Sequence, residues 1–388
     1  MSRLNYRHTL SACAVASVTQ AIVCTLAPLL FVTFRKEFGL TMGQLSFLVF
    51  LTFGVQLGMD ALSTGLVDRI PARVLIVAAH ACSAVGLIAM AVLPGRMPPF
   101  AALIVAMSLY SVGGGLVEVL SSPIASACPV KNPKTLMSLL HSVFSWGQVI
   151  VVLVSTGCFA LFGVEHWRWI ALLWAALPAF NTVWFALVPL YEIGENRDEA
   201  GASMLSGTFF VLLGLMVVTG AAEQSVSQWA SAFAEKGLGI SKTAGDLAGI
   251  CLFAAAMGLA RTFYGKWGEK IDLLRFMTVS AALCILGYLL TVFAPWPALA
   301  LAGCCLCGLS VGILWPGTLT LAGQRIQVSA GMYAWLALAG DVGCALGPTA
   351  VGLLSQSHGD SLSYGLMFAM AFPAAALVCL LWLRRKRT

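Results

Sequence analysis

The chain is organised as long apolar runs separated by short polar connections. Twelve such runs follow one another, and each holds the roughly 20 residues that a membrane-spanning helix needs. Their centres lie near residues 21, 54, 84, 114, 149, 179, 220, 253, 284, 310, 342 and 373. Most connections are short, as at residues 67–73, 95–99 and 129–135. The pattern predicts an all-α integral membrane protein with 12 transmembrane helices.

The composition excludes most other classes of protein. Of the 388 residues, 60% are apolar and 10% are charged, and the mean hydropathy is +0.91. Soluble domains carry about 25% charged residues, and a compact globule has too little interior for this much apolar side chain. A soluble enzyme, a nucleic-acid-binding protein and a disordered scaffold are therefore excluded. The net charge of +6 is explained by topology and by contact with the lipid bilayer, without a nucleic-acid partner.

Lysine and arginine are distributed unevenly over the two sides that twelve spans define. If the N-terminus is cytoplasmic, 16 of the 22 lie at cytoplasmic ends and loops. The other six lie on the opposite side: Arg35, Lys36, Arg96, Arg168, Lys236 and Lys242. Cytoplasmic loops carry an excess of these residues. We therefore predict a multi-pass protein of the cell (inner) membrane with both termini in the cytoplasm.

The second half of the chain repeats the first at one fixed offset. Three matches lie 193 residues apart: Gly65-Leu66 with Gly258-Leu259, Pro123 with Pro316, and Gly147-Gln148 with Gly340-Asp341. Their agreement indicates two six-helix halves in parallel repeat, an arrangement typical of carriers. We predict an N-terminal bundle over residues 1–190, a cytoplasmic linker over 191–205 and a C-terminal bundle over 206–388.

The loop between spans 2 and 3 carries a charged motif, GLVDRIPAR, at residues 65–73. Together with the six-plus-six helices, it resembles the loop signature of the major facilitator superfamily: a glycine, an aspartate, an arginine and a following basic residue. It departs from that signature because Gly65 is one position too close to Asp68 and Pro71 replaces a glycine. The resemblance implies a transporter fold and four gating residues, which are Asp68, Arg69, Arg73 and, in the repeated copy, Arg261.

Span 7 carries a second, finer resemblance. Glu223, Ser225 and Trp229 match the glutamate, the serine two positions later and the tryptophan six positions later of the fucose-permease-like branch. Span 1 lacks the membrane-embedded aspartate of fucose permease itself and has Gln20 as its strongly polar residue. The resemblance therefore implies a transporter of this branch without implying fucose as its solute.

Acidic residues inside the spans are candidates for ion coupling. A carboxylate near the bilayer centre costs about 2.5–3.5 kcal/mol on insertion, and four qualify: Asp60, Glu118, Glu223 and Asp341. A carboxyl group that binds and releases a proton near neutral pH is what a proton-coupled carrier requires. We predict Glu223, Asp341 and Glu118 as coupling residues, with His141 as a candidate proton partner. The alternative for each is a structural hydrogen bond or ion pair between helices, which we favour for Asp60 and His141.

Amide and indole side chains in the central spans indicate a polar solute. Amides bind hydroxyl groups, and indoles cover the apolar face of a ring-bearing molecule such as a sugar. The predicted solute-binding residues include two of the acids and are Gln20, Trp146, Gln148, Glu223, Gln224, Trp229, Trp315 and Asp341. The alternative is ordinary helix packing. Glu223 and Trp229 are six residues apart and face one cavity only if span 7 bends, for which Gly220 is the candidate.

These residues predict a secondary active transporter that moves a small polar solute by alternating access. We expect proton symport, with sodium as the alternative coupling ion, and a monomeric protein without a cofactor or metal. Two other functions stay open, namely proton-antiport efflux of amphipathic compounds and a non-transporting membrane receptor or scaffold. An enzyme is not expected, because the GxSxG pattern at residues 308–312 lies within an apolar span rather than at a strand-to-helix turn.

Overall fold

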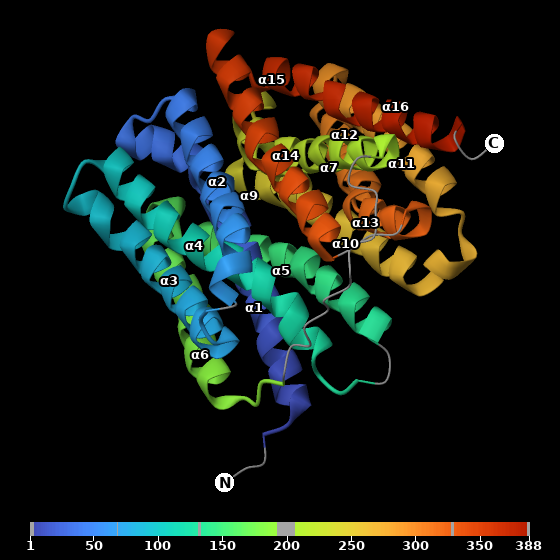
Figure 1. Ribbon diagram of the computed structural model, residues 1–388. Coiled ribbons are helices and arrows are strands. Elements are labelled where there is room, and N and C mark those ends of the chain that lie inside the picture. Colours follow the sequence, from blue (N-terminus) through green and yellow to red (C-terminus); the bar gives the residue numbers. More distant parts are fainter. Residues whose placement is uncertain (1–3, 68, 131–132, 192–205, 327–329, 386–388) are drawn as a thin grey trace. The chain divides into compact units, whose positions relative to one another are not determined.

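The computed structural model describes residues 4–67, 69–130, 133–191, 206–326 and 330–385. Within these residues there are 12 helical segments that are long and apolar enough to cross a membrane. Each contains one of the twelve centres read from the sequence. The predicted all-α membrane fold with 12 transmembrane helices is therefore confirmed (Figure 1).

The first six spans are each built from one main helix. They are α1 (Tyr6–Phe38), α2 (Met42–Val67), α3 (Ala72–Val92), α4 (Pro99–Ser126), α5 (Pro133–Phe162) and α6 (Trp167–Leu187). Short 3₁₀ helices follow α3 as η1 (Leu93–Gly95) and precede α6 as η2 (Val164–His166).

Most of the last six spans are interrupted. Span 7 consists of α7 (Gly207–Ser227), α8 (Ala230–Ala232) and η3 (Phe233–Gly237), and span 8 of α9 (Lys242–Asp246), η4 (Leu247–Cys251) and α10 (Leu252–Trp267). The remaining elements are η5 (Gly268–Lys270), α11 (Leu273–Phe293), α12 (Pro297–Val311), α13 (Leu314–Arg325), α14 (Ala330–Ser357), α15 (Leu362–Ala369) and α16 (Ala371–Arg385). Both η3 and η4 are π-helical, a geometry that is common at functional sites.

Local sequence explains where several helices begin and end. Asn5 caps α1 by accepting a hydrogen bond from the Arg7 amide, and Gly39 ends the same helix with a φ of 66° that favours glycine. Pro99 occupies the first turn of α4, where no amide donor is needed. Ser206 and Asp272 cap α7 and α11 with their side-chain oxygens. The helix ends are therefore encoded locally, independently of the packing.

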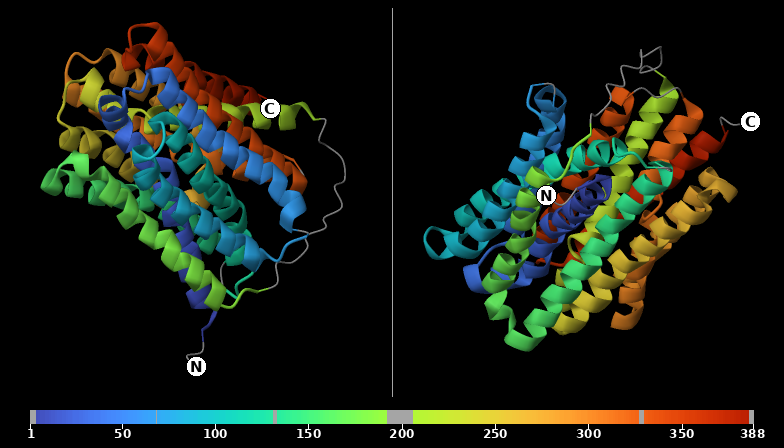
Figure 2. Two further views of the ribbon diagram at one scale, coloured as in Figure 1. Left: turned by 90° about the vertical axis from the view of Figure 1, so that its left-hand side faces the viewer. Right: turned by 90° about the horizontal axis from the view of Figure 1, so that it is seen from below.

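The described residues form two compact units. The first holds residues 1–40 and 51–195, and the second holds residues 41–50 and 196–388, so that the beginning of α2 belongs with the second unit. In Figure 2 the chain can be followed by colour, from the blue to green helices α1 to α6 to the yellow-green to red helices α7 to α16. Of the predicted linker, all but Tyr191 lies outside the described residues. The predicted domain boundaries therefore stay a prediction.

In the first unit, α1 is tied at both ends to α6 or to the residues that follow α6. Near its beginning, the Thr9 hydroxyl donates to the Pro189 carbonyl. Near its end, Glu37 accepts hydrogen bonds from the Trp167 indole at 2.7 Å and from the Arg168 guanidinium at 2.6 Å. These polar contacts fix both ends of α1 within the first unit.

Buried His80 of α3 belongs to the same packing. Its Nδ1 lies 2.8 Å from the Ile76 carbonyl oxygen, and its Nε2 lies 2.9 Å from Asn181 Nδ2 of α6. Asn181 Nδ2 also donates to the Ala12 carbonyl of α1. Both ring nitrogens therefore have partners within the unit, which is a structural role for this histidine.

Candidate functional site

The first unit brings two amides and a carboxylate together from three helices. Gln20 of α1 donates from Nε2 to Gln56 Oε1 of α2 at 2.8 Å and to Glu118 Oε2 of α4 at 3.0 Å. Both glutamine side chains are buried, whereas Glu118 is exposed. Gln20 thus uses both amide hydrogens, one to hold Gln56 and one to orient the carboxylate. Gln56 was not among the residues predicted from the sequence.

Three consecutive glycines of α4 make this juxtaposition possible. A Cβ on Gly113 would collide with the Ala79 carbonyl oxygen of α3. On Gly114 it would lie 2.8 Å from Gln20 Oε1, and on Gly115 it would lie 2.8 Å from the Met59 Cβ of α2. Each glycine therefore faces a different neighbouring helix, and α4 packs closely against all three.

Gln148 and Trp146 of α5 have different surroundings. Gln148 is 1% exposed and donates to the Thr25 hydroxyl of α1 at 3.3 Å. Trp146 is 37% exposed. The glycine between them, Gly147, packs on α1, where an added Cβ would lie 3.1 Å from the Ala21 Cβ. Gln148 therefore lies in the packed interior of the unit, while Trp146 lies at its surface.

The second unit contains a buried ion pair at Glu223, which was predicted as a coupling and solute-binding residue. Arg261 Nη2 of α10 lies 3.1 Å from Glu223 Oε2 of α7, and their side chains are 11% and 9% exposed. The same guanidinium donates from Nε to the Gly312 carbonyl oxygen at 3.3 Å. Arg261 was predicted as a gating residue of a loop, but it lies within helix α10. It neutralises Glu223, and the sequence pattern did not reveal this pairing.

A short row of amides continues from this carboxylate along α7. Gln224 Nε2 donates to Glu223 Oε1 at 3.3 Å, and Gln228 Nε2 donates to Gln224 Oε1 at 3.1 Å. All three side chains are buried. Amides oriented in one direction are suited to hydrogen-bond a hydroxylated solute or to transmit a change of charge on Glu223.

Span 7 is interrupted, although not at the glycine proposed for a bend. The helix breaks at residues 228–229, beside Trp229. Gly220 instead serves close packing, because a Cβ there would collide with the Gly340 carbonyl oxygen of α14. The Trp229 indole is 0% exposed and donates to the Pro348 carbonyl at 2.8 Å. Trp229 thus anchors the interruption of span 7 to α14 in this structure.

Trp315 packs against Gly340, the residue before Asp341. The Trp315 ring lies over Gly340 of α14, where it fills the position that a Cβ would occupy, and Asp341 is the next residue. Asp341 is 8% exposed, whereas Trp315 is half-buried. Trp315 of α13 therefore packs on α14 one residue before Asp341.

The other predicted gating and coupling residues are placed as follows. Arg73 of α3 donates to the Phe185 and Ala186 carbonyls at 2.8 and 2.9 Å, where it caps the end of α6. Arg69 lies exposed in the turn before α3. Asp68 lies outside the described residues, as does the side chain of His141. Their predicted roles stay predictions.

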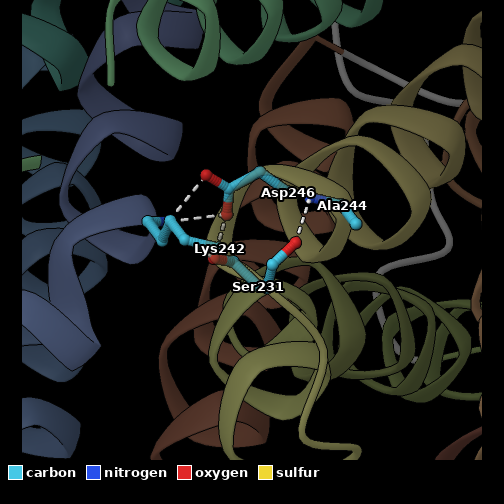
Figure 3. Close-up of polar contacts among 5 residues, drawn as sticks. Ser231, Lys242, Ala244 and Asp246 are labelled. Atoms are coloured by element: carbon cyan, nitrogen blue, oxygen red, sulfur yellow. Dashed lines mark hydrogen bonds and ion pairs between the residues drawn. The ribbon is translucent and has the colours of Figure 1, made fainter. Parts of the chain in front are cut away.

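A further polar cluster joins spans 7 and 8 and was not predicted. Asp246 of α9 is fully buried and accepts from Lys242 Nζ at 2.6 and 2.7 Å. Figure 3 shows both side chains turned toward Ser231 of α8, whose hydroxyl also donates to Asp246. The carboxylate is thus neutralised and hydrogen-bonded inside the unit, which fixes the two interrupted spans to each other.

No group of three metal-ligating side chains was found among the described residues. The two missed partners, Gln56 and Arg261, did leave a signal in the sequence. Gln56 is the glutamine in the middle of the second apolar run, and Arg261 is the single charge within residues 252–265. Each polar residue inside a span needs a partner on another helix, but the sequence does not say which one.

Comparisons with known proteins agree with this architecture. The sequence matches the family described as Major Facilitator Superfamily over residues 10–326 and 204–388. An uncharacterised MFS-type transporter of Yersinia pestis is 24% identical over 341 residues, which cover 82% of this chain and 85% of that protein.

Two solved structures have a similar fold at low sequence identity. The nucleoside transporter NupG, solved as a point mutant, aligns with a TM-score of 0.77 and 13% identity over 97% of this chain and 99% of that one. FucP in its outward conformation aligns with a TM-score of 0.65 and 13% identity over the same shares of both chains.

Proposed function

Because this chain belongs to the major facilitator superfamily of membrane transporters, we propose that it moves a small, polar, hydroxyl-bearing solute by proton symport. The observation that carries the proposal is the buried pair of Glu223 and Arg261 with the amides of Gln224 and Gln228 beside it. These groups combine a carboxyl group able to take up a proton with side chains able to bind hydroxyls.

The pair explains how a proton could be linked to transport. Removing one partner of a buried ion pair leaves an uncompensated charge and costs about 3–5 kcal/mol. A proton on Glu223 removes the negative partner and leaves Arg261 charged, so the second unit favours a different arrangement when the proton is bound. A single charge crossing 100 mV supplies about 2.3 kcal/mol, which is a roughly 50-fold solute gradient.

The first unit supports a polar solute rather than an apolar one. Three buried amide atoms, Gln20 Oε1, Gln56 Nε2 and Gln148 Oε1, have no hydrogen-bond partner among the described residues. An unpaired buried polar atom costs about 1–3 kcal/mol. A molecule rich in hydroxyl groups both donates and accepts, and therefore suits such amides. NupG transports nucleosides, and nucleosides and monosaccharides are the first solutes to test.

The experiment is transport in proteoliposomes with an imposed proton gradient, an imposed sodium gradient or neither. The panel contains uridine, two monosaccharides and the amphipathic cation ethidium. The proposal expects a uridine or sugar signal that rises at least tenfold with an inward proton gradient and acidifies the lumen on solute addition. Ethidium efflux in exchange for protons would instead indicate the antiport function. If folded protein of known orientation transports no member of the panel, the proposal is contradicted.

A further inference from the structure

The interruption of span 10 leaves one backbone carbonyl without its helical donor. The turn at residues 312–313 separates α12 from α13. In a continuous helix, the Gly312 carbonyl would accept from the amide four residues later. That residue is Pro316, which has no amide hydrogen. The neighbouring Ile313 carbonyl does have its helical partner, the Gly317 amide, at 2.7 Å.

Arg261 replaces the missing donor. Its Nε donates to the Gly312 carbonyl oxygen at 3.3 Å, while its Nη2 binds Glu223. Close packing allows this reach, because Gly312 lies against α10 and an added Cβ would be 2.9 Å from both the Ala260 Cβ and the Met257 carbonyl oxygen. One planar guanidinium thus joins a carboxylate on α7 to the interruption between α12 and α13.

Beyond the interruption lies Trp315, whose ring packs on Gly340 of α14. A change in the donor to the Gly312 carbonyl therefore acts on the helix that carries this indole. Other titratable groups are near the same turns of α7. Tyr288 of α11 donates to the Ala222 carbonyl, and Cys344 Sγ of α14 lies 3.1 Å from a Cβ built on Gly220. Asp341 follows the glycine under Trp315. Arg261 contacts both the Glu223 carboxylate and, at the interruption, the Gly312 carbonyl oxygen.

We propose that Arg261 is a positioning residue that transmits the charge of Glu223 to the interruption of span 10 and thereby to Trp315. When Glu223 is neutral, the guanidinium loses its ion pair with that carboxylate and moves away from the Gly312 carbonyl. The interruption then changes its geometry because Pro316 offers no replacement donor. The inference rests on the proposed coupling role of Glu223 and adds the route by which its charge reaches a predicted solute-binding indole.

The experiment follows Trp315 directly by fluorine NMR of the full chain in lipid nanodiscs, labelled with 5-fluorotryptophan. Trp315→Phe assigns the resonance. Glu223→Gln, which imitates the neutral glutamate, is expected to shift that resonance by more than its linewidth. In Pro316→Ala, the restored amide at position 316 binds the Gly312 carbonyl, so the shift caused by Glu223→Gln is expected to fall within the linewidth. No solute or gradient is needed, so a failed transport assay leaves this result unaffected.

Two further variants keep the test decisive. Pro178→Ala restores an amide inside α6 of the first unit and is expected to leave the Glu223→Gln shift intact. Arg261→Lys keeps the charge but lacks the planar fork, and is expected to abolish the shift as Pro316→Ala does, which answers the question if the proline variant fails to fold. An unmoved Trp315 resonance in Glu223→Gln, or a full shift that persists in Pro316→Ala or Arg261→Lys, would overturn the proposal.

Discussion

Arg73 holds the last turn of α6 through two backbone carbonyls. A cation at the C-terminus of a helix both satisfies these acceptors and complements the helix dipole, an effect of about 0.3–1 kcal/mol. We expect Arg73→Gln to lower the midpoint of thermal unfolding by about 2 °C. A thiol-reactive dye that reaches buried cysteines such as Cys13 only on unfolding measures this midpoint in detergent.

The matched control is Arg69→Gln, since Arg69 is exposed in the adjacent turn and is expected to leave the midpoint unchanged. If both variants shift the midpoint of thermal unfolding equally, the capping contacts of Arg73 do not account for the effect of Arg73→Gln. If Arg73→Gln leaves the midpoint unchanged but alters which side of the membrane reaches the solute site, Arg73 is the gating residue predicted from the loop motif.

Trp229 shows that residue type alone does not decide between a ligand contact and a packing role. An indole beside a membrane-embedded glutamate is compatible with a ligand platform and with an anchor between helices. The structure buries Trp229 completely and directs its Nε1 to the Pro348 carbonyl. Burial and hydrogen-bond direction depend on which helix lies opposite, and a single sequence does not contain that information.

At the scale of the element, α4 depends on its glycine triplet. A Cβ on Gly114 would lie 2.8 Å from Gln20 Oε1 and 3.0 Å from Val23 Cγ1. Gly114→Ala should therefore push the Gln20 amide away from Glu118 and destabilise the first unit, at a typical overpacking cost of about 1–3 kcal/mol. The thermal midpoint and solute transport should both fall.

Gly58→Ala in α2 is the corresponding control, because nothing lies within 4 Å of a Cβ at that position. It should raise helix propensity slightly and leave both measurements near wild type. Equal behaviour of the two variants would show that the approach of α4 to α1 does not organise the Gln20 cluster.

At the same scale, the positions of the spans were predictable from the sequence, whereas the interruptions within them were not. The hydrophobic runs located all 12 spans because length and polarity alone decide what crosses a bilayer. Gly220 was expected to bend span 7, yet it allows α14 to approach, and the break lies at residues 228–229. A glycine inside a span serves bending or close packing, and the choice depends on the neighbouring helix.

At the scale of the whole molecule, the uneven distribution of Lys and Arg makes a topology prediction. With 16 of the 22 on the side of the N-terminus, we expect both termini in the cytoplasm. Green fluorescent protein fused to the C-terminus should fluoresce in a bacterial host. Alkaline phosphatase fused after Gly163, between α5 and α6, should be active outside the cytoplasm. The reverse pattern for both fusions would refute the orientation.

The candidate site was predictable in its ingredients and not in its pairings. Gln20, Glu118 and Glu223 stood out because polar groups are costly inside a span, and the structure brings the first two into contact. Gln56 and Arg261 complete the two clusters through contacts between helices that are distant in sequence. Polarity is a property of one residue, but a pairing depends on the three-dimensional arrangement of several helices.

The central claim is that Glu223 carries the coupled proton, and Glu223→Gln tests it directly. Glutamine imitates the protonated side chain, keeps its size and cannot release a proton. In proteoliposomes, the variant should still exchange labelled solute for unlabelled solute across the membrane, but should fail to accumulate it when a proton gradient is imposed. Wild-type protein in the same vesicles should do both. Gradient-driven accumulation by Glu223→Gln at the wild-type level would contradict the account.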